Sequence, residues 1–207
     1  MSIDPKSKNK NFNTKNIKTY LTEYSNELNS ALKHVSESDL EKTRQLLLEI
    51  RRESGRVFTA GNGGSAAISE HLGCDWHKGV HLKSKPGLHV HSLVSNVALL
   101  TAVANDFGYQ KSFSYQLELA QLRKVDVLLL ISSSGNSDNI VNAAEYAKAQ
   151  GCKIIGLTGF TGGKLKNLSD ISLHVPFENY GLVEDAHQIL MHVIAQFHDL
   201  EYSNMHG

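Results

Sequence analysis

The segment from Asp126 to Gln150 constrains the fold of this chain more than any other. It begins with an unbroken apolar run, passes through a turn rich in serine, and ends in an Ala-rich stretch. A continuous apolar run of this length is typical of a strand buried on both faces of a parallel sheet. The Ala-rich stretch is typical of a helix. We therefore predict a strand at 126–131, a turn at 132–137, and a helix that ends near Gln150.

The turn itself suits a phosphate group. At a helix N-terminus several backbone N–H groups lack partners and the helix dipole is positive. Serine hydroxyls and a glycine add hydrogen-bond donors there with little bulk and no negative charge. The alternative is that Ser and Asn only cap the helix, but one residue suffices for a cap. The residues predicted to bind the phosphate are Ser132, Ser133, Ser134 and Ser137.

Strands and helices alternate along most of the chain. Strands are expected at 56–60, 88–94, 126–131, 153–157 and 171–175, with helices between them. This alternation predicts an α/β fold, a parallel sheet of five strands covered by helices on both faces, which is a three-layer α-β-α sandwich. In such sheets ligands bind beyond the carboxyl ends of the strands.

An N-terminal helical hairpin is expected at 15–55, before the first strand. Apolar residues from Ile17 to Val35 recur at helical spacing, and Ser38 and Glu41 form a capping box for a second helix that ends near Gly55. Residues 1–14 are polar and aperiodic and are expected to be a disordered tail. Residues 15–203 are expected to fold as one unit, with the sheet domain at 56–203.

The composition limits the kinds of partner that this chain can bind. The formal net charge is zero, which argues against nucleic acid held by bulk charge and against a basic membrane-binding surface. No apolar run approaches the length of a membrane span. Cys74 and Cys152 form no CxxC pair, and a reduced, cytoplasmic compartment is expected.

A second glycine-rich turn follows the strand at 56–60. It reads Gly-Asn-Gly-Gly-Ser over 61–65 and lacks both the GxGxxG spacing and a Walker lysine, which sets aside dinucleotide and ATP binding. Its glycines permit close backbone approach, and polar groups beside them suit a hydroxylated ligand. Both turns follow strands of one parallel sheet, so they can converge on one ligand. The ligand-binding candidates in this turn are Asn62, Gly63 and Ser65.

Two helices carry groups for acid–base or metal chemistry. His71 and Asp75 are four residues apart and share a helix face, and they can bind a divalent metal or share a proton, or be an ordinary polar pair. His192 lies near the apolar stripe of the last helix and is either a ligand or a hydrogen-bonded core histidine. Asn105 and Asp106 are expected in a helix break, where Asp106 either binds sugar hydroxyls or is a turn residue.

Taken together, five motifs resemble those of the sugar isomerase (SIS) domain family, in its phosphoheptose isomerase branch. They are GNGGS at 61–65, NDFG at 105–108, SSSGNS at 132–137, LTGFTGGK at 157–164 and VEDAHQILMH at 183–192. The resemblance covers about residues 16–200. It implies the SIS fold, phosphate binding by the serine turn, and sugar contacts from Asn62, Ser65 and Asp106.

The resemblance also implies a catalytic and metal site. Family members have a His and a Glu where this chain has His71 and Asp75, and a Gln and a His where it has Glu184 and His192. These four would bind Zn²⁺, with Asp75 as base and His192 as acid. Asp75 is one methylene shorter than Glu, and Glu184 makes the site more anionic. Along a helix, Glu184 and His192 are about 12 Å apart, so both reach one metal only if Glu184 lies at or before the helix start.

The activity implied is an aldose–ketose isomerisation through a cis-enediol. The substrate would be sedoheptulose 7-phosphate, converted to D-glycero-D-manno-heptose 7-phosphate for lipopolysaccharide or capsule synthesis, by a homotetramer whose only other partner is the sugar phosphate. Two alternatives stay open. One is a non-enzymatic SIS module that binds a phosphosugar or a replication-initiator protein. The other is an isomerase for a different sugar phosphate.

Overall fold

A sheet of five parallel strands forms the centre of the computed structural model, which describes residue 12, residues 14–78 and residues 87–206. The strand order is β2-β1-β3-β4-β5, which puts a topological switch point between β1 and β3. The strands are β1 (Arg56–Gly61), β2 (His89–Ser92), β3 (Val127–Ser132), β4 (Lys153–Thr158) and β5 (Ile171–His174). The predicted parallel sheet is confirmed. The tail expected at 1–14 and the loop after His77 lie largely outside the described residues.

The apolar run is the central strand β3, and all of its residues are buried. Val127, Leu129 and Ile131 pack in one apolar core. Leu128 and Leu130 pack in a second core on the opposite face of the sheet. Because successive side chains of a strand point to opposite faces, a strand between two helical layers needs apolar residues at every position.

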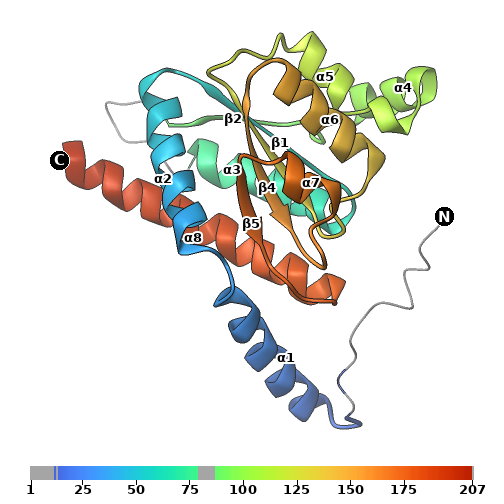
Figure 1. Cartoon of the computed structure of the whole chain (residues 1–207), viewed down its shortest axis with the longest axis vertical. Coiled ribbons are helices and arrows are strands. Elements are labelled where there is room, and N and C mark those ends of the chain that lie inside the picture. Colours follow the sequence, from blue (N-terminus) through green and yellow to red (C-terminus); the bar gives the residue numbers. More distant parts are fainter. Residues whose placement is uncertain (1–11, 13, 79–86, 207) are drawn as a thin grey trace.

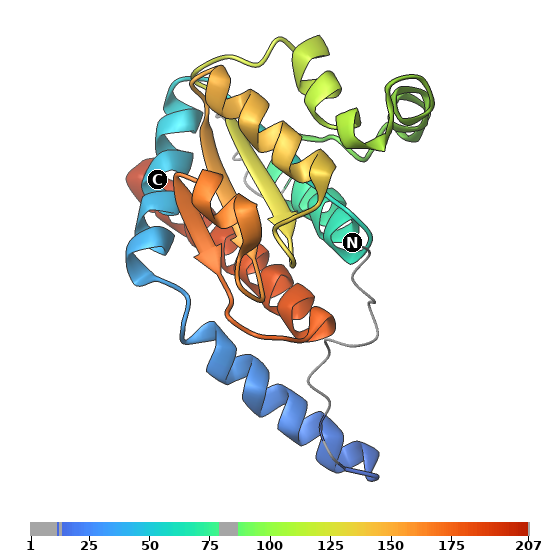
Figure 2. The ribbon, with the colours of Figure 1, turned by 45° about the vertical axis from the view of Figure 1, so that its right-hand side comes forward.

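Helices cover both faces of the sheet, as Figures 1 and 2 show. The first core lies under α2 (Glu37–Arg52), α3 (Gly64–Lys78) and α8 (Tyr180–His206). The second lies under α5 (Ser114–Leu119), α6 (Asp138–Ala149) and α7 (Gly163–Leu168). The result is the predicted three-layer sandwich, in which α3 and α8 lie in contact on the same face.

The N-terminal hairpin consists of α1 (Ile17–Leu32) and α2, and α1 extends away from the body of the molecule (Figure 2). The hydroxyl of Tyr24 on α1 donates to Asp185 on α8 at 2.6 Å. The expected capping box at Ser38 is wrong: Ser36 is the N-cap, and its side chain accepts from the backbone N–H of Asp39. The helix therefore starts two residues early, with Glu37 and Asp39 near its positive end.

The segment between β2 and β3 differs from expectation in two places. Helix α4 (Val97–Phe107) continues through the residues expected to form a break, and it ends at Gly108, which has a positive φ of 87°. The sequence also predicts one further helix from this break to about Leu122, and the structure divides that segment into a 3₁₀ turn, η1 (Tyr109–Lys111), and α5. Gly108 adopts its positive φ without strain, because glycine has no Cβ.

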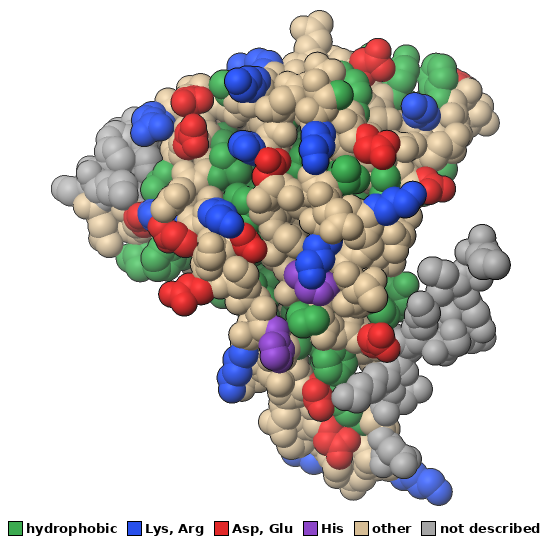
Figure 3. All heavy atoms as spheres, in the orientation of Figure 1, with side chains coloured by type: hydrophobic (Ala, Val, Ile, Leu, Met, Phe, Trp, Pro, Cys, Tyr) green, Lys and Arg blue, Asp and Glu red, His purple; other side chains and the backbone are tan. Residues whose placement is uncertain are grey.

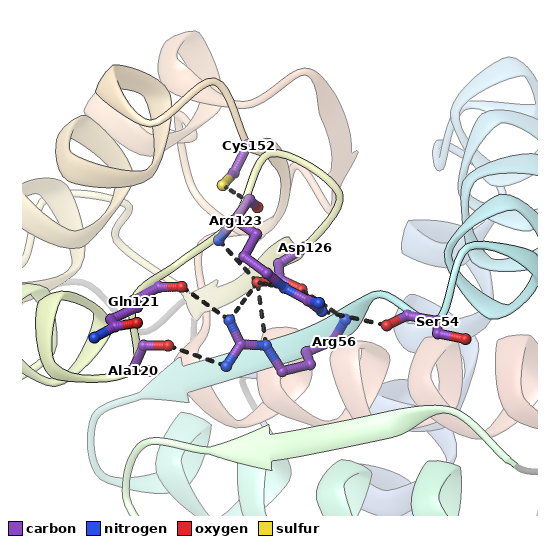
Figure 4. A network of polar contacts seen from close by, with 7 residues as sticks. All are labelled: Ser54, Arg56, Ala120, Gln121, Arg123, Asp126 and Cys152. Carbon is purple, nitrogen blue, oxygen red and sulfur yellow. Dashed lines mark hydrogen bonds and ion pairs between the residues drawn. The ribbon is translucent and has the colours of Figure 1, made fainter.

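A buried carboxylate ties the segments at the amino ends of β1 and β3 together (Figure 4). Asp126 is fully buried and accepts hydrogen bonds from the guanidinium groups of Arg56 and Arg123. Arg56 also donates to the carbonyls of Ala120 and Gln121. This network lies at the end of the strands opposite to both glycine- and serine-rich turns, so it serves the fold.

Charges of both signs are interspersed over the face in Figure 3. This distribution accords with the balance of Lys plus Arg against Asp plus Glu. Among the described residues, no helix combines the length and the apolarity needed to cross a membrane.

Candidate active site

The serine turn connects β3 to α6, as predicted. Ser137 occupies the N-cap position of α6, but its side chain makes no capping hydrogen bond. Capping alone therefore does not explain the serine at this position, and its hydroxyl is available to a ligand. The free backbone N–H groups of the first turn of α6 add donors for an anion.

Ser133 gives the clearest sign that the turn binds a ligand. Its side chain is buried, with 5 % of its surface exposed, and its Oγ has no hydrogen-bond partner among the described atoms. Burial of an unpaired hydroxyl costs free energy. A phosphate oxygen in the turn would supply the missing partner.

Gly135 and Asn136 shape the turn. Gly135 has a φ of 64°, and a Cβ there would clash with the carbonyl oxygen of Gly162. The Asn136 side chain donates to the Ser134 carbonyl at 3.1 Å and accepts from the backbone N–H of Lys164 at 3.0 Å. The segment before α7 is thus held against the serine turn, and Asn136 has a structural role.

The second glycine-rich turn lies beside the serine turn, because Gly61 of β1 pairs with Ile131 of β3. Asn62 exchanges two hydrogen bonds of 2.9 Å with Asn139, in the first turn of α6. The Tyr109 hydroxyl also donates to Asn62, at 2.7 Å. Asn62 therefore joins the two turns. Sequence reasoning missed the contributions of Asn139 and Tyr109.

Two other residues of this turn have distinct surroundings. Gly63 is exposed and has a φ of 56°, and a Cβ there would meet open space. Ser65 is buried at the start of α3, with 4 % of its surface exposed. The turn therefore presents exposed backbone at Gly63 above a buried hydroxyl at Ser65.

His71, Asp75 and His192 meet where α3 contacts α8. Asp75 Oδ2 lies 3.3 Å from His71 Nε2 and 3.5 Å from His192 Nε2. One ligand atom from each of the three residues lies within 4.8 Å of the others. All three side chains are partly exposed, so small molecules can reach them. This is the part of the predicted site that the structure brings together.

Glu184 lies away from this cluster. Helix α8 begins at Tyr180, so Glu184 is inside the regular helix and about 12 Å from His192 along its axis. Its carboxylate lies against Gly64, where a Cβ would collide with it. Burial and the nearby Asp185 carboxylate raise the pKa of Glu184. The structure therefore places Glu184 at the glycine-rich turn, where it can contact a ligand, rather than at the cluster of His71.

Gln188 lies where Glu184 was expected. Its Nε2 is 2.9 Å from His71 Nδ1 and 3.4 Å from His192 Nε2. Sequence reasoning did not single it out, although it precedes His192 by one helical turn, and that spacing puts two residues on one face.

Asn105 and Asp106 lie in the last turn of α4, and both are exposed. The Asn105 amide donates to the Asp106 carboxylate at 2.9 Å. The break expected at these residues is wrong. Among the described residues, no hydrogen bond joins either side chain to the serine turn or to the His71 cluster.

The donor set of the cluster fits a divalent metal. In a tetrahedral zinc site, ligand distances of about 2.0–2.1 Å separate neighbouring ligand atoms by about 3.3 Å. The Asp75 oxygen lies 3.3 Å and 3.5 Å from the two imidazole nitrogens. Two imidazoles and a carboxylate also match the ligand preference of zinc, and three protein ligands leave a position for substrate.

Comparisons with known proteins agree with this architecture. The SIS domain family model matches residues 20–159. The phosphoheptose isomerase of Aliarcobacter butzleri is 39 % identical over 165 residues, covering 80 % of this chain and 86 % of the relative. The phosphoheptose isomerase of Helicobacter pylori strain P12 is 40 % identical over 167 residues, covering 79 % of this chain and 86 % of the relative. The solved phosphoheptose isomerase of Neisseria gonorrhoeae superposes with a TM-score of 0.80 at 29 % identity, covering 88 % of this chain and 96 % of that one. The chain therefore belongs to the SIS domain family, in its phosphoheptose isomerase branch.

Proposed function

We propose that this protein is a phosphoheptose isomerase that interconverts sedoheptulose 7-phosphate and D-glycero-D-manno-heptose 7-phosphate. The observation that carries the proposal is the proximity of Asp75 and His192, whose side chains are 3.5 Å apart. They lie on α3 and α8, whose N-terminal ends meet at the glycine-rich turn. A carboxylate and an imidazole so placed can move two protons on one substrate. The names of the relatives at 39 % and 40 % identity support the same substrate.

The serine turn holds the phosphate, through the hydroxyls of Ser133 and Ser137 and the N-terminus of α6. In the ketose-to-aldose direction Asp75 removes a proton from C1 of the open-chain sugar, and His192 protonates the carbonyl oxygen on C2. The product of these two transfers is a cis-enediol. Asp75 then returns its proton to C2 while His192 takes the proton from the C1 hydroxyl, which completes the aldose and restores both groups.

His71, Asp75 and His192 are the residues that would hold a zinc ion, as their spacing supports. A bound zinc ion supplies Lewis-acid polarisation of the substrate carbonyl. The remaining chemistry rests on the chain itself, because both side chains that move protons are held by helices packed on the sheet.

The experiment is the isomerisation of sedoheptulose 7-phosphate by the wild type, His192→Ala and a matched control, His34→Ala. His34 is exposed in the turn after α1. We expect activity in the wild type and the control, and a loss of at least about 100-fold in His192→Ala, the range of general acid–base catalysis. Tight binding of the sugar phosphate without turnover would instead identify a binding module. Turnover of another ketose phosphate alone would change the substrate.

We further propose a homotetramer. Val193, Phe197 and Leu200 are exposed on one side of α8, and Ile17 and Leu21 are exposed on α1. Large apolar side chains grouped on two helices are typical of a protein interface. Light scattering at micromolar concentration should give about four times the chain mass of 22.8 kDa. A mass of one chain would contradict the proposal.

The proposed compartment is the cytoplasm. Cys74 is exposed and Cys152 is buried, and both are free thiols, which suits a reducing environment. Fractionation of the native host with immunodetection would test this, and recovery outside the cytoplasmic fraction would contradict it.

A further inference from the structure

Gln188 contacts both imidazoles of the cluster. It comes from α8, one turn before His192, and its amide nitrogen lies 2.9 Å from His71 Nδ1 and 3.4 Å from His192 Nε2. The side chain is half-buried, so neighbouring atoms limit its rotamers. From this position its amide can act on both histidines.

His71 uses both of its ring nitrogens. Nδ1 faces Gln188 and Nε2 faces Asp75 at 3.3 Å. In a neutral imidazole one nitrogen carries the proton and the other carries a lone pair. The two contacts are therefore coupled: a proton on Nδ1 leaves a lone pair on Nε2, and a proton on Nε2 leaves a lone pair on Nδ1.

A primary amide can serve either tautomer of His71. With its N–H toward Nδ1, Gln188 donates, and His71 Nε2–H donates to Asp75. With its carbonyl oxygen toward Nδ1, Gln188 accepts, and the Nε2 lone pair faces Asp75 and His192. The two orientations differ by a half-turn of the amide. A carboxylate at residue 188 would only accept, and an aliphatic side chain would do neither.

Only the tautomer with its proton on Nδ1 can bind a cation through Nε2, the nitrogen that faces Asp75. A metal ligand must present a lone pair, and its other ring nitrogen then donates to a fixed acceptor. The accepting orientation of Gln188 provides that acceptor, and the donating orientation stabilises the cluster through the contact between His71 and Asp75.

We propose that Gln188 is a positioning residue that holds the His71 ring in both of its tautomers: it donates to Nδ1 in the metal-free protein, where Asp75 accepts from Nε2–H, and it accepts from Nδ1–H when zinc is bound. It acts through His71 and does not touch the substrate. This inference rests on the function proposed above only in that it places a cation at the same cluster.

The test uses full-length protein labelled with ¹⁵N-histidine, with zinc chloride as the probe. Two-bond ¹H–¹⁵N correlation spectra report which ring nitrogen of His71 carries the proton. In the wild type we expect the proton on Nε2 without zinc and on Nδ1 with zinc. In Gln188→Glu a carboxylate faces each ring nitrogen, so both nitrogens should carry a proton without zinc and only Nδ1 with zinc. In metal-free Gln188→Leu the proton should stay on Nε2, because Asp75 still accepts from it.

Zinc affinity, measured by competition with a chelating dye, gives a second readout. Gln188→Leu should bind zinc about 10- to 100-fold more weakly, the usual effect of losing a group that orients a metal ligand. Gln188→Glu should bind at least as tightly as the wild type. The matched control is Gln45→Leu, an exposed helical glutamine on α2 that bonds Glu41, and it should behave as the wild type. Melting temperatures verify that each variant is folded.

Two results would overturn the proposal. One is wild-type zinc affinity in folded Gln188→Leu, and the other is a His71 proton that stays on the same nitrogen when zinc is added. Neither result depends on turnover, so failure of this inference is distinct from failure of the isomerase assay. An inactive wild type with the expected spectra would refute the proposed function alone.

Discussion

Trp76 Nε1 donates a hydrogen bond to the carbonyl oxygen of Met191 at 3.2 Å, between two fully buried residues. Trp76 directly follows Asp75 on α3, and Met191 directly precedes His192 on α8. This single bond therefore joins the two helices next to the proposed base and acid. It sets the axial position of one helix against the other at the point where the two functional side chains meet.

Replacement of Trp76 by Phe removes this bond while keeping an aromatic ring in the core. We expect a loss of about 1–3 kcal/mol in the free energy of unfolding, because one buried hydrogen bond and some buried volume are lost. The rate constant kcat should fall more than KM rises, since the phosphate site is untouched. Urea unfolding and steady-state kinetics measure the two effects. An unchanged kcat would show that the bond does not position the site.

Replacement of Ser133 by Ala separates ligand binding from folding. The buried Ser133 hydroxyl has no partner among the described atoms, so its removal should leave stability unchanged or slightly higher. The KM for the sugar phosphate should rise about 10-fold or more, the effect of losing a hydrogen bond to a charged group. Thermal unfolding and kinetics test this, with Ser38→Ala on the exposed side of α2 as the control. A destabilised protein with normal KM would give Ser133 a structural role.

Replacement of Asp126 by Asn tests the network in Figure 4. Burial alone raises the pKa of Asp126, but hydrogen bonds from Arg56 and Arg123 outweigh it and hold the pKa well below its usual range. Such a carboxyl stabilises the fold above about pH 4 and loses this contribution as the pH falls toward its folded pKa. We expect Asp126→Asn to lose about 3–5 kcal/mol at pH 7.

The dependence of stability on pH in the acid range tests the sign of the Asp126 effect. The stability difference between wild type and Asp126→Asn should shrink as the pH is lowered below about 4. Urea unfolding at a series of pH values measures it, with Asp138→Asn at the exposed start of α6 as the control. A difference that is constant from pH 7 to pH 3 would contradict the role of the charge.

Two buried histidines of α8 should also make the free energy of unfolding depend on pH. Burial lowers the pKa of His187 and of His198 to about 4. Between about pH 4 and pH 6.5 the unfolded chain binds more protons than the folded one, so stability falls as the pH falls through this window. Each histidine contributes a slope of up to about 1.4 kcal/mol per pH unit.

Unfolding free energies of His187→Leu between pH 4 and pH 7 test this effect. The variant should show a shallower slope than the wild type, while His34→Leu in an exposed turn should keep the wild-type slope. Equal slopes in all three proteins would contradict this effect, because they would mean that folding does not change the pKa of His187.

Much of the fold could be predicted because its strongest signals are local. The apolar residues of β3 indicated burial on both faces, and each of the five strands was expected within a few residues of its observed bounds. Element ends were less certain. Ser36 and Ser38 are both good capping residues, and the structure uses Ser36, whose side chain accepts from the backbone N–H of Asp39.

The sequence by itself determined the order of strands and helices, the serine turn at the end of β3, and the shared face of His71 and Asp75, because each depends on residues close together in the chain. Only the tertiary structure decided which residues of α8 meet them. Asn179 accepts from the backbone N–H of Leu182 and starts α8 early, so Glu184 lies inside the helix, and the packing of α8 on α3 brings Gln188 and His192 to His71. Contacts between distant segments set the axial position of a helix, and its own periodicity does not.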